Sequence, residues 1–194
     1  MDLIESIIST NRDCNFIKFD FNPSKDGCWH NNNARWIATQ RSKSEYILYI
    51  DADEVFESDK FKLWINSKNN FSDVTTFATY WYFRSEKYQA KSYEDSPLMV
   101  NKSFVNEQTI FHGLERGVYK YINSNNKEFS VFGLDEKPMC HHYSWALTKE
   151  EMLAKVKNWS HSQDKDWTAM VEEEFSREFN GTDFVHGYEY NILQ

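Results

Sequence analysis

The sequence predicts a single α/β domain over residues 1–194, with a mostly parallel central sheet and a helical C-terminal part. The run YILYI at 46–50 is apolar throughout and lacks the alternation of a half-exposed strand, which suits a parallel strand covered on both faces. A strand, a helix and a strand follow one another up to residue 50, the order of a right-handed crossover. Apolar residues repeat with helical spacing after Thr148.

The elements of this crossover come first in the chain. Residues 1–10 carry apolar side chains on one face and predict the end of a helix, and residues 14–21 (CNFIKFDF) predict a strand. Residues 32–43 (NNARWIATQRSK) predict a helix with an asparagine as N-cap and basic residues near its end. The strand that ends at Asp51 follows directly.

The rest of the chain predicts further helices and strands. Residues 57–69 predict a short helix, and residues 74–89 (VTTFATYWYFRSEKYQ) predict one strand because Thr, Tyr, Phe and Trp favour strands. Two shorter strand candidates lie in a loop-rich region, at 96–104 and 129–134. Residues 148–151 fit a capping box at the start of a C-terminal helix, with a further helix and a tail behind it.

The composition limits the partners and the compartment that we expect. The net charge of −8 argues against a nucleic-acid partner and against an anionic membrane surface. Three cysteines, Cys14, Cys28 and Cys140, are too few and too scattered for a disulfide framework, which favours a reducing compartment. No apolar stretch approaches the roughly 20 residues of a transmembrane segment, and no signal peptide is visible. We therefore expect a cytoplasmic protein.

Two carboxylates, Asp51 and Asp53, follow the apolar strand at the position where open α/β sheets bind their ligands. Residues on either side of Ala52 point the same way in an extended segment, so both carboxylates can face one ion. Neighbouring carboxylates repel each other unless a cation neutralises them, and Mg²⁺ and Mn²⁺ prefer such oxygen ligands. The alternative is an acidic, solvated strand end.

Three further groups are candidates for the same site. His142, in the pair His141-His142, can complete a carboxylate site for Mn²⁺, although two histidines packed under a loop would give the same sequence. Glu115 is a candidate general base, and Arg116 is a candidate partner for a phosphate or for Glu115 in a surface ion pair. The stretch 79–83 (TYWYF) could present rings to a sugar, but a strand in the core explains it better.

Two segments resemble motifs of the family 2 glycosyltransferases. In NNARWIATQRSKSEYILYIDADEVF, Arg35 falls on the family's arginine, and Trp36 replaces the asparagine that follows it there. MCHHYSWALTKEEMLAKVKNWSH is similar to the C-terminal signature of a bacterial and viral subgroup that includes lipopolysaccharide-core transferases. His142 falls on the signature histidine, and Glu115 lies in the region of the subgroup's acidic acceptor-side residue. The resemblance covers residues 10–165.

The resemblance implies a GT-A fold, whose Rossmann-like sheet binds a nucleotide-diphosphate sugar. It implies that Asp53, assisted by Asp51 and His142, holds Mn²⁺ or Mg²⁺ against the diphosphate. Glu115 would take the proton from an acceptor hydroxyl on a glycan, a lipid-linked glycan or a protein, in a one-step inverting displacement. The residues that contact the donor would be Arg35, Asp51 and Arg116. The family's opening segment, which binds the nucleotide base, has no counterpart here: either Met1 is an internal start or a trimmed boundary, or the protein has lost its base pocket.

Two other functions fit parts of the sequence. Asp51-Ala-Asp53-Glu-Val55 matches the D-x-D-x-[TV] motif of haloacid-dehalogenase-like phosphatases, although the later residues of that family's site find no convincing match. The other alternative is a non-catalytic module with a degenerate glycosyltransferase fold, which would bind a glycan or a partner chain. The missing opening segment favours this second alternative.

Overall fold

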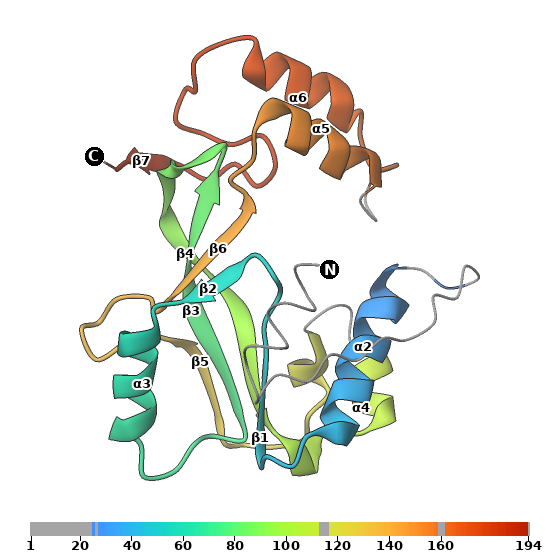
Figure 1. The fold of residues 1–194 in the computed structure, drawn as a ribbon, viewed down its shortest axis with the longest axis vertical. Coiled ribbons are helices and arrows are strands. Elements are labelled where there is room, and N and C mark those ends of the chain that lie inside the picture. The colour runs from blue at the N-terminus through green and yellow to red at the C-terminus, as the bar shows by residue number, and fades with distance from the viewer. Residues whose placement is uncertain (1–24, 26, 113–116, 159–161, 194) are drawn as a thin grey trace, which may run out of the picture.

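The computed structural model describes residues 25, 27–112, 117–158 and 162–193, and Figure 1 shows the fold. The predicted helix at 1–10 and strand at 14–21 lie outside the described residues. The helices are α2 (Gly27–Arg41), α3 (Ser58–Ser67), α4 (Glu107–His112), α5 (Lys149–Asn158) and α6 (Trp167–Phe175), with 3-10 turns η1 (Lys102–Phe104) and η2 (Gly117–Lys120). The strands are β1 (Tyr46–Tyr49), β2 (Glu54–Phe56), β3 (Val74–Phe83), β4 (Ser85–Asn101), β5 (Lys127–Val131), β6 (Cys140–Trp145) and β7 (Tyr190–Ile192).

These strands form one sheet in the order β1-β4-β3-β6-β2, with β5 also paired to β3 and β7 to β4. The pairs β1–β4, β3–β4, β2–β6 and β4–β7 are antiparallel, whereas β3 runs parallel to β5 and to β6. The prediction of a mostly parallel, Rossmann-like sheet of the GT-A kind is therefore wrong. The sheet is mostly antiparallel and strongly curled (Figure 1).

The error originates in the segment 74–89, which was predicted as one strand. This segment is a tight hairpin, in which β3 ends at Phe83, Arg84 turns the chain with a φ of 60°, and β4 begins at Ser85. A left-handed backbone is uncommon for arginine, so the turn lacks the Gly or Asn that usually marks it in a sequence. β4 then returns along β3 and pairs with β1, whose continuous apolar run carries no information about strand direction.

The predicted helices agree with the structure more closely than the predicted sheet does. α3 lies within the predicted helix at 57–69, and α2 covers most of the predicted one but begins at Gly27, so no asparagine caps its start. The capping box is confirmed, because the Thr148 N–H donates to Glu151 Oε2 at 2.9 Å and the Glu151 N–H donates to Thr148 Oγ1 at 3.3 Å. The shorter strand candidates correspond to the end of β4 and to β5.

The core is divided into three clusters along the sheet. One lies between the sheet and α5 and α6, the second lies toward α2, α4 and η2, and the third lies under α3 (Figure 1). The largest fully buried side chains include Phe83 in the first cluster, Val100 in the second and Phe77 in the third. The β3–β4 hairpin contributes to all three clusters, so it holds the two ends of the molecule together. None of the helices described is both long and apolar enough to cross a membrane.

The buried hydroxyl of Tyr82 predicts a specific pH dependence of stability. Burial raises the pKa of Tyr82 from 10.0 to about 12, so the unfolded chain loses this proton first as the pH rises. The contribution of Tyr82 is fully present below pH 10 and is lost between pH 10 and 12. At about 1.4 kcal/mol per pKa unit, the loss is at most about 3 kcal/mol.

We expect Tyr82→Phe to reduce the decline in the free energy of unfolding over this pH range, as measured by urea denaturation. Phe lacks the hydroxyl that contacts His141 Nδ1 at 2.6 Å and accepts from Gln89 Nε2 at 2.8 Å, so the variant is also less stable at neutral pH. Tyr121→Phe, at an exposed tyrosine, should leave the decline unchanged. An equal decline in Tyr82→Phe and in the unaltered protein would contradict the assignment.

Candidate functional site

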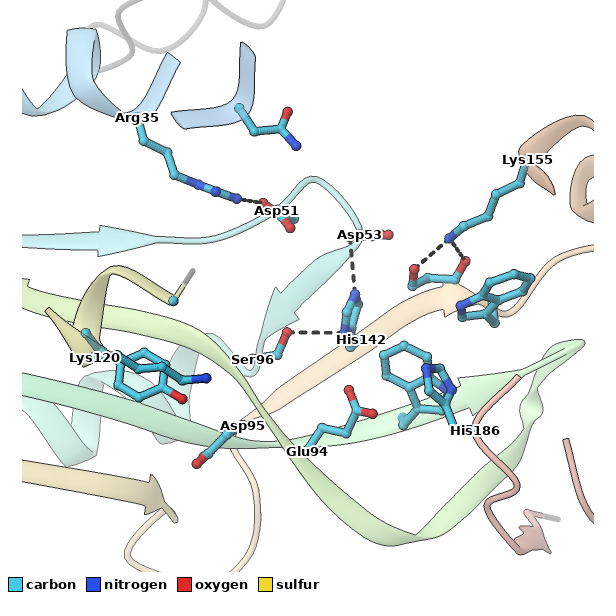
Figure 2. Close-up of a pocket in the computed structure, with 16 residues that line it drawn as sticks. Arg35, Asp51, Asp53, Glu94, Asp95, Ser96, Lys120, His142, Lys155 and His186 are labelled. Atoms are coloured by element: carbon cyan, nitrogen blue, oxygen red, sulfur yellow. Dashed lines mark hydrogen bonds and ion pairs between the residues drawn. The ribbon is translucent and has the colours of Figure 1, made fainter. Parts of the chain in front are cut away.

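A cavity of about 440 Å³ opens where α2, the turn between β1 and β2, strands β3, β4 and β6, and helix α5 come together. Figure 2 shows its lining residues. Arg35 of α2 and Lys155 of α5 reach it from two sides, and Asp53 and His142 lie between them. Four of the sequence candidates, Arg35, Asp51, Asp53 and His142, therefore share one cavity.

Asp51 and Asp53 point to different partners because the chain turns at residues 52 and 53. The turn is closed by a hydrogen bond from the Glu54 N–H to the Asp51 carbonyl at 3.1 Å. Arg35 Nη2 donates to Asp51 Oδ1 at 3.0 Å, so α2 and the turn are joined by an ion pair at the rim of the cavity (Figure 2). In this arrangement Asp51 neutralises Arg35, and Asp53 is the carboxylate that faces the histidine.

Asp53 and His142 form the centre of the site. The sheet register sets His142 beside Glu54, and the Tyr143 N–H donates to the Asp53 carbonyl at 2.9 Å, which ties the turn to β6. His142 Nε2 then lies 3.6 Å from Asp53 Oδ1. When the His142 ring is protonated, its hydrogen bond and its charge lower the pKa of Asp53, against the smaller opposing effect of burial, which favours the anionic form of Asp53.

Lys155 brings a partly buried positive charge to the same side. Its Nζ donates to the Ser144 carbonyl at 2.5 Å and to Ser144 Oγ at 2.6 Å, and it lies 4.7 Å from the centroid of the Trp145 ring. Burial lowers the pKa of Lys155, and the charge of Asp53 acts in the opposite direction. An anion bound in the cavity would therefore stabilise the charged form of this lysine.

The opposite wall consists of groups that can hydrogen-bond to hydroxyls: Glu94 and Asp95 on β4, and His186 on the loop before β7 (Figure 2). Tyr188 Oη donates to Glu94 Oε1 at 2.7 Å, which fixes the position of this carboxylate. The rings of His186 and His142 contact the Trp81 ring at centroid distances of 4.9 and 4.6 Å. Both imidazoles therefore pack edge-on against the same indole.

The buried Asp183 organises the loop that carries His186. Its Oδ1 accepts the backbone N–H groups of residues 185, 186 and 187. Its Oδ2 accepts the backbone N–H of Tyr188 at 3.0 Å and the side-chain hydroxyl of Tyr190 at 2.9 Å. Gly187 has a φ of 77°, a left-handed conformation that suits glycine at this turn. The loop therefore has one well-supported conformation, which holds His186 at the cavity.

Two sequence candidates, Glu115 and Arg116, lie outside the described residues. Gly117, the residue after them in the chain, lines the cavity. The candidate stretch 79–83 faces two ways: Trp81 lines the cavity, whereas Tyr82 is buried against His141. Neither ring is more than slightly exposed, so the stretch belongs to the core, with one side chain at the cavity wall.

The donor atoms of Asp53 and His142 fit a shared divalent cation. Mg²⁺ binds its ligands at about 2.1 Å, so two donors up to about 4 Å apart can contact one ion. The 3.6 Å between Asp53 Oδ1 and His142 Nε2 meets this condition. Within the described part of the chain, no group of three or more His, Cys, Asp or Glu side chains is placed to hold a metal. The pair therefore suits an ion that takes its other ligands from substrate phosphates and water.

Comparisons with known proteins identify no relative of this chain. No family model matches the chain, and no curated protein and no solved structure is significantly similar to it. The functional argument therefore depends on the residues of the cavity itself.

Sequence reasoning missed the groups that carry no motif. Lys155 lies within the segment that resembles the transferase signature, and its place in that segment is the one signal that could have identified it. Glu94 lies on β4, between the predicted strands at 74–89 and 96–104, and His186 lies in the C-terminal tail, beyond the resemblance. Their common location follows only from the pairing of β4 with β3 and β7.

We expect Asp183→Asn to release the loop that holds His186. The amide keeps a single acceptor oxygen and directs an NH₂ donor toward backbone N–H groups, so it should lower the free energy of unfolding by about 1–3 kcal/mol. Hydrogen exchange of the amides at 185–188 should become faster at the same time. Asp135→Asn, at an exposed aspartate, serves as the control and should change neither quantity. Unaltered exchange in Asp183→Asn would rule out this role.

Proposed function

We propose that the protein is a metal-dependent glycosyltransferase, which moves a sugar from a nucleotide-diphosphate donor to a hydroxyl of a glycan, a lipid-linked glycan or a protein. The observation that carries the proposal is the position of the Asp53–His142 pair, between Arg35 and Lys155, in one cavity. A carboxylate and an imidazole beside a positive side chain can hold a divalent cation together with a diphosphate, and Asp53, His142 and Lys155 offer this combination.

Asp53 and His142 are the residues that would hold Mn²⁺ or Mg²⁺. Such an ion would neutralise the charge that develops on the departing diphosphate. Lys155 supports the same role from the protein side, because its partly buried ammonium gains a counter-charge when an anion enters. Arg35 is already paired with Asp51, so it acts chiefly by fixing the turn that carries Asp53.

The opposite wall suits a sugar. Carboxylates and imidazoles bind sugar hydroxyls through directed hydrogen bonds, and Glu94, Asp95 and His186 provide both kinds of group. In the reaction, the acceptor oxygen attacks the anomeric carbon, and the bond from that carbon to the diphosphate breaks. The proton of the acceptor passes to a general base, for which we propose Glu115. A single displacement of this kind inverts the anomeric centre.

One observation favours a second candidate, a binding module without catalysis. The described residues supply only a pair of ligands for a metal ion, and a pair is a weak site without substrate oxygens. Such a module would bind a saccharide at the Glu94 wall and would not transfer it. The phosphatase alternative has less support, because Asp51, which would be its nucleophile, is paired with Arg35.

Thermal and chemical denaturation with Mn²⁺ and a panel of nucleoside diphosphates tests the proposal. A ligand that binds only the folded state, at about 100 times its dissociation constant, adds roughly 2.7 kcal/mol to the free energy of unfolding. We expect stabilisation by Mn²⁺ with one nucleotide, and loss of that stabilisation in Asp53→Ala. Asp59→Ala changes an exposed acidic residue of α3 and should retain it.

Two results would count against the transferase. Stabilisation that persists in Asp53→Ala would place the ligand elsewhere. Stabilisation by Mn²⁺ and simple saccharides, without any effect of a nucleotide, would instead favour the binding module.

Lys155→Met tests the diphosphate side separately. Met keeps the aliphatic contact with Trp145 but removes the charge, so we expect the affinity for pyrophosphate in the presence of Mn²⁺ to fall by about tenfold or more. Lys157→Met alters an exposed lysine on the same helix and should retain the affinity. Isothermal titration calorimetry measures both. Equal affinities for the two variants would remove Lys155 from the site.

A further inference from the structure

Glu54 is a buried carboxylate directly behind the proposed metal ligands. Its side chain has no exposed surface. Oε2 accepts the backbone N–H of Asp51 at 2.7 Å, and Oε1 accepts the hydroxyl of Ser96 in a short hydrogen bond. A buried carboxylate is stable only when its oxygens receive such hydrogen bonds. The positions of the two donor groups are therefore fixed relative to the Glu54 carboxylate.

The hydrogen bond from Ser96 to Glu54 determines what Ser96 can do on its other side. A serine hydroxyl has one proton, and here that proton is donated in the hydrogen bond to the Glu54 carboxylate. Toward His142, the Ser96 oxygen can therefore act only as an acceptor. His142 Nδ1 lies 3.3 Å from this oxygen. Nδ1 must therefore carry a proton, which leaves Nε2 as the nitrogen that presents a lone pair in the neutral ring. Nε2 is the atom that faces Asp53 Oδ1 at 3.6 Å.

We infer that Glu54 and Ser96 are positioning residues, which hold His142 as the Nδ1-protonated tautomer and so present Nε2 as a ligand to a divalent cation beside Asp53. The inference rests on the proposed function for the identity of the cation. In the neutral ring, a lone pair that faces a carboxylate oxygen is unfavourable, and a metal ion between the two atoms removes the conflict. Hydrogen bonds from a ligand histidine to outer groups commonly set its tautomer in this way.

The backbone explains how Ser96 reaches this position. The register of β4 against β3 shifts between the pairs Thr76–Leu98 and Ala78–Asp95, so β4 has one residue more than β3 at this point. Such a bulge redirects a side chain, and it accommodates Pro97, which has no N–H to offer the ladder. The bulge places Ser96 between Glu54 and His142, which belong to the two paired strands β2 and β6.

The tautomer can be measured without any metal. Nitrogen-15 spectra of the histidine rings at about pH 8.5, roughly two units above the ordinary histidine pKa, distinguish the protonated from the bare nitrogen. We expect His142 to carry its proton on Nδ1 in the unaltered protein, and to lose this preference in Ser96→Ala. A His142 ring protonated on Nε2 in the unaltered protein would overturn the inference, whatever the variants do.

Metal affinity then tests the consequence, with Mn²⁺ and pyrophosphate as the probe. Ser96→Ala and Glu54→Gln should each weaken Mn²⁺ binding by about 10- to 100-fold. The matched controls are Ser124→Ala, which removes a serine hydroxyl donated to Asp73 Oδ2 at 2.5 Å, and Glu174→Gln, which changes another buried glutamate. Both controls should bind Mn²⁺ like the unaltered protein.

The outcomes separate the two proposals. If the tautomer is Nδ1-protonated but the unaltered protein binds no Mn²⁺, the metal dependence of the proposed function is contradicted. The role of His142 as a metal ligand is then contradicted as well. If the unaltered protein binds Mn²⁺ and the folded Ser96→Ala variant binds it equally well, the positioning role fails and the proposed function stands. Should Glu54→Gln not fold, Ser96→Ala and the spectrum of the unaltered protein still decide the question.

Discussion

The carboxylate of Glu54 has no exposed surface, and it connects the turn after β1 to the β4 bulge, directly beside His142 on β6. Removal of a carboxylate from water costs several kcal/mol unless hydrogen bonds compensate for the loss. The backbone of Asp51 and the side chain of Ser96 provide that compensation, so their positions cannot change independently. The same turn determines the position of Asp53, and the pairing of β2 with β6 determines the position of His142. One buried charge therefore specifies the geometry of four neighbouring groups.

The hairpin of β3 and β4 brings the two walls of the cavity together. One wall is formed by the turn after β1 and by β6, and it is flanked by positive side chains from α2 and α5. The other is formed by β4 and by the loop that Asp183 supports. Because the three core clusters lie along the same hairpin, the packing of α5 and α6 at one end and of α2 at the other holds Lys155 and Arg35 at a fixed separation. The charge pattern of the cavity is thus a consequence of the packing of the core.

Part of this arrangement could be predicted from the sequence. Asp51, Asp53, Arg35 and His142 came from two short motifs, and the structure brings all four to one cavity. The capping box at Thr148 and the helix at 57–69 could also be predicted, because the sequence patterns that indicate them are local. The topology of the sheet could not be predicted, because the turn at Arg84 has no Gly or Asn and the apolar run of β1 fits either strand direction. The roles of Ser96, Glu94 and His186 depend on register, on a bulge and on a distant loop, which no local pattern encodes.

The central claim is that Asp53 and His142 together bind a divalent cation in contact with a diphosphate. The most direct test is a crystal of the protein with Mn²⁺ and pyrophosphate, measured for the anomalous scattering of manganese. The account predicts one strong peak at about 2.1 Å from both Asp53 Oδ1 and His142 Nε2, in contact with a pyrophosphate oxygen. A manganese peak bound to other residues, or pyrophosphate bound in the cavity without manganese, would contradict it.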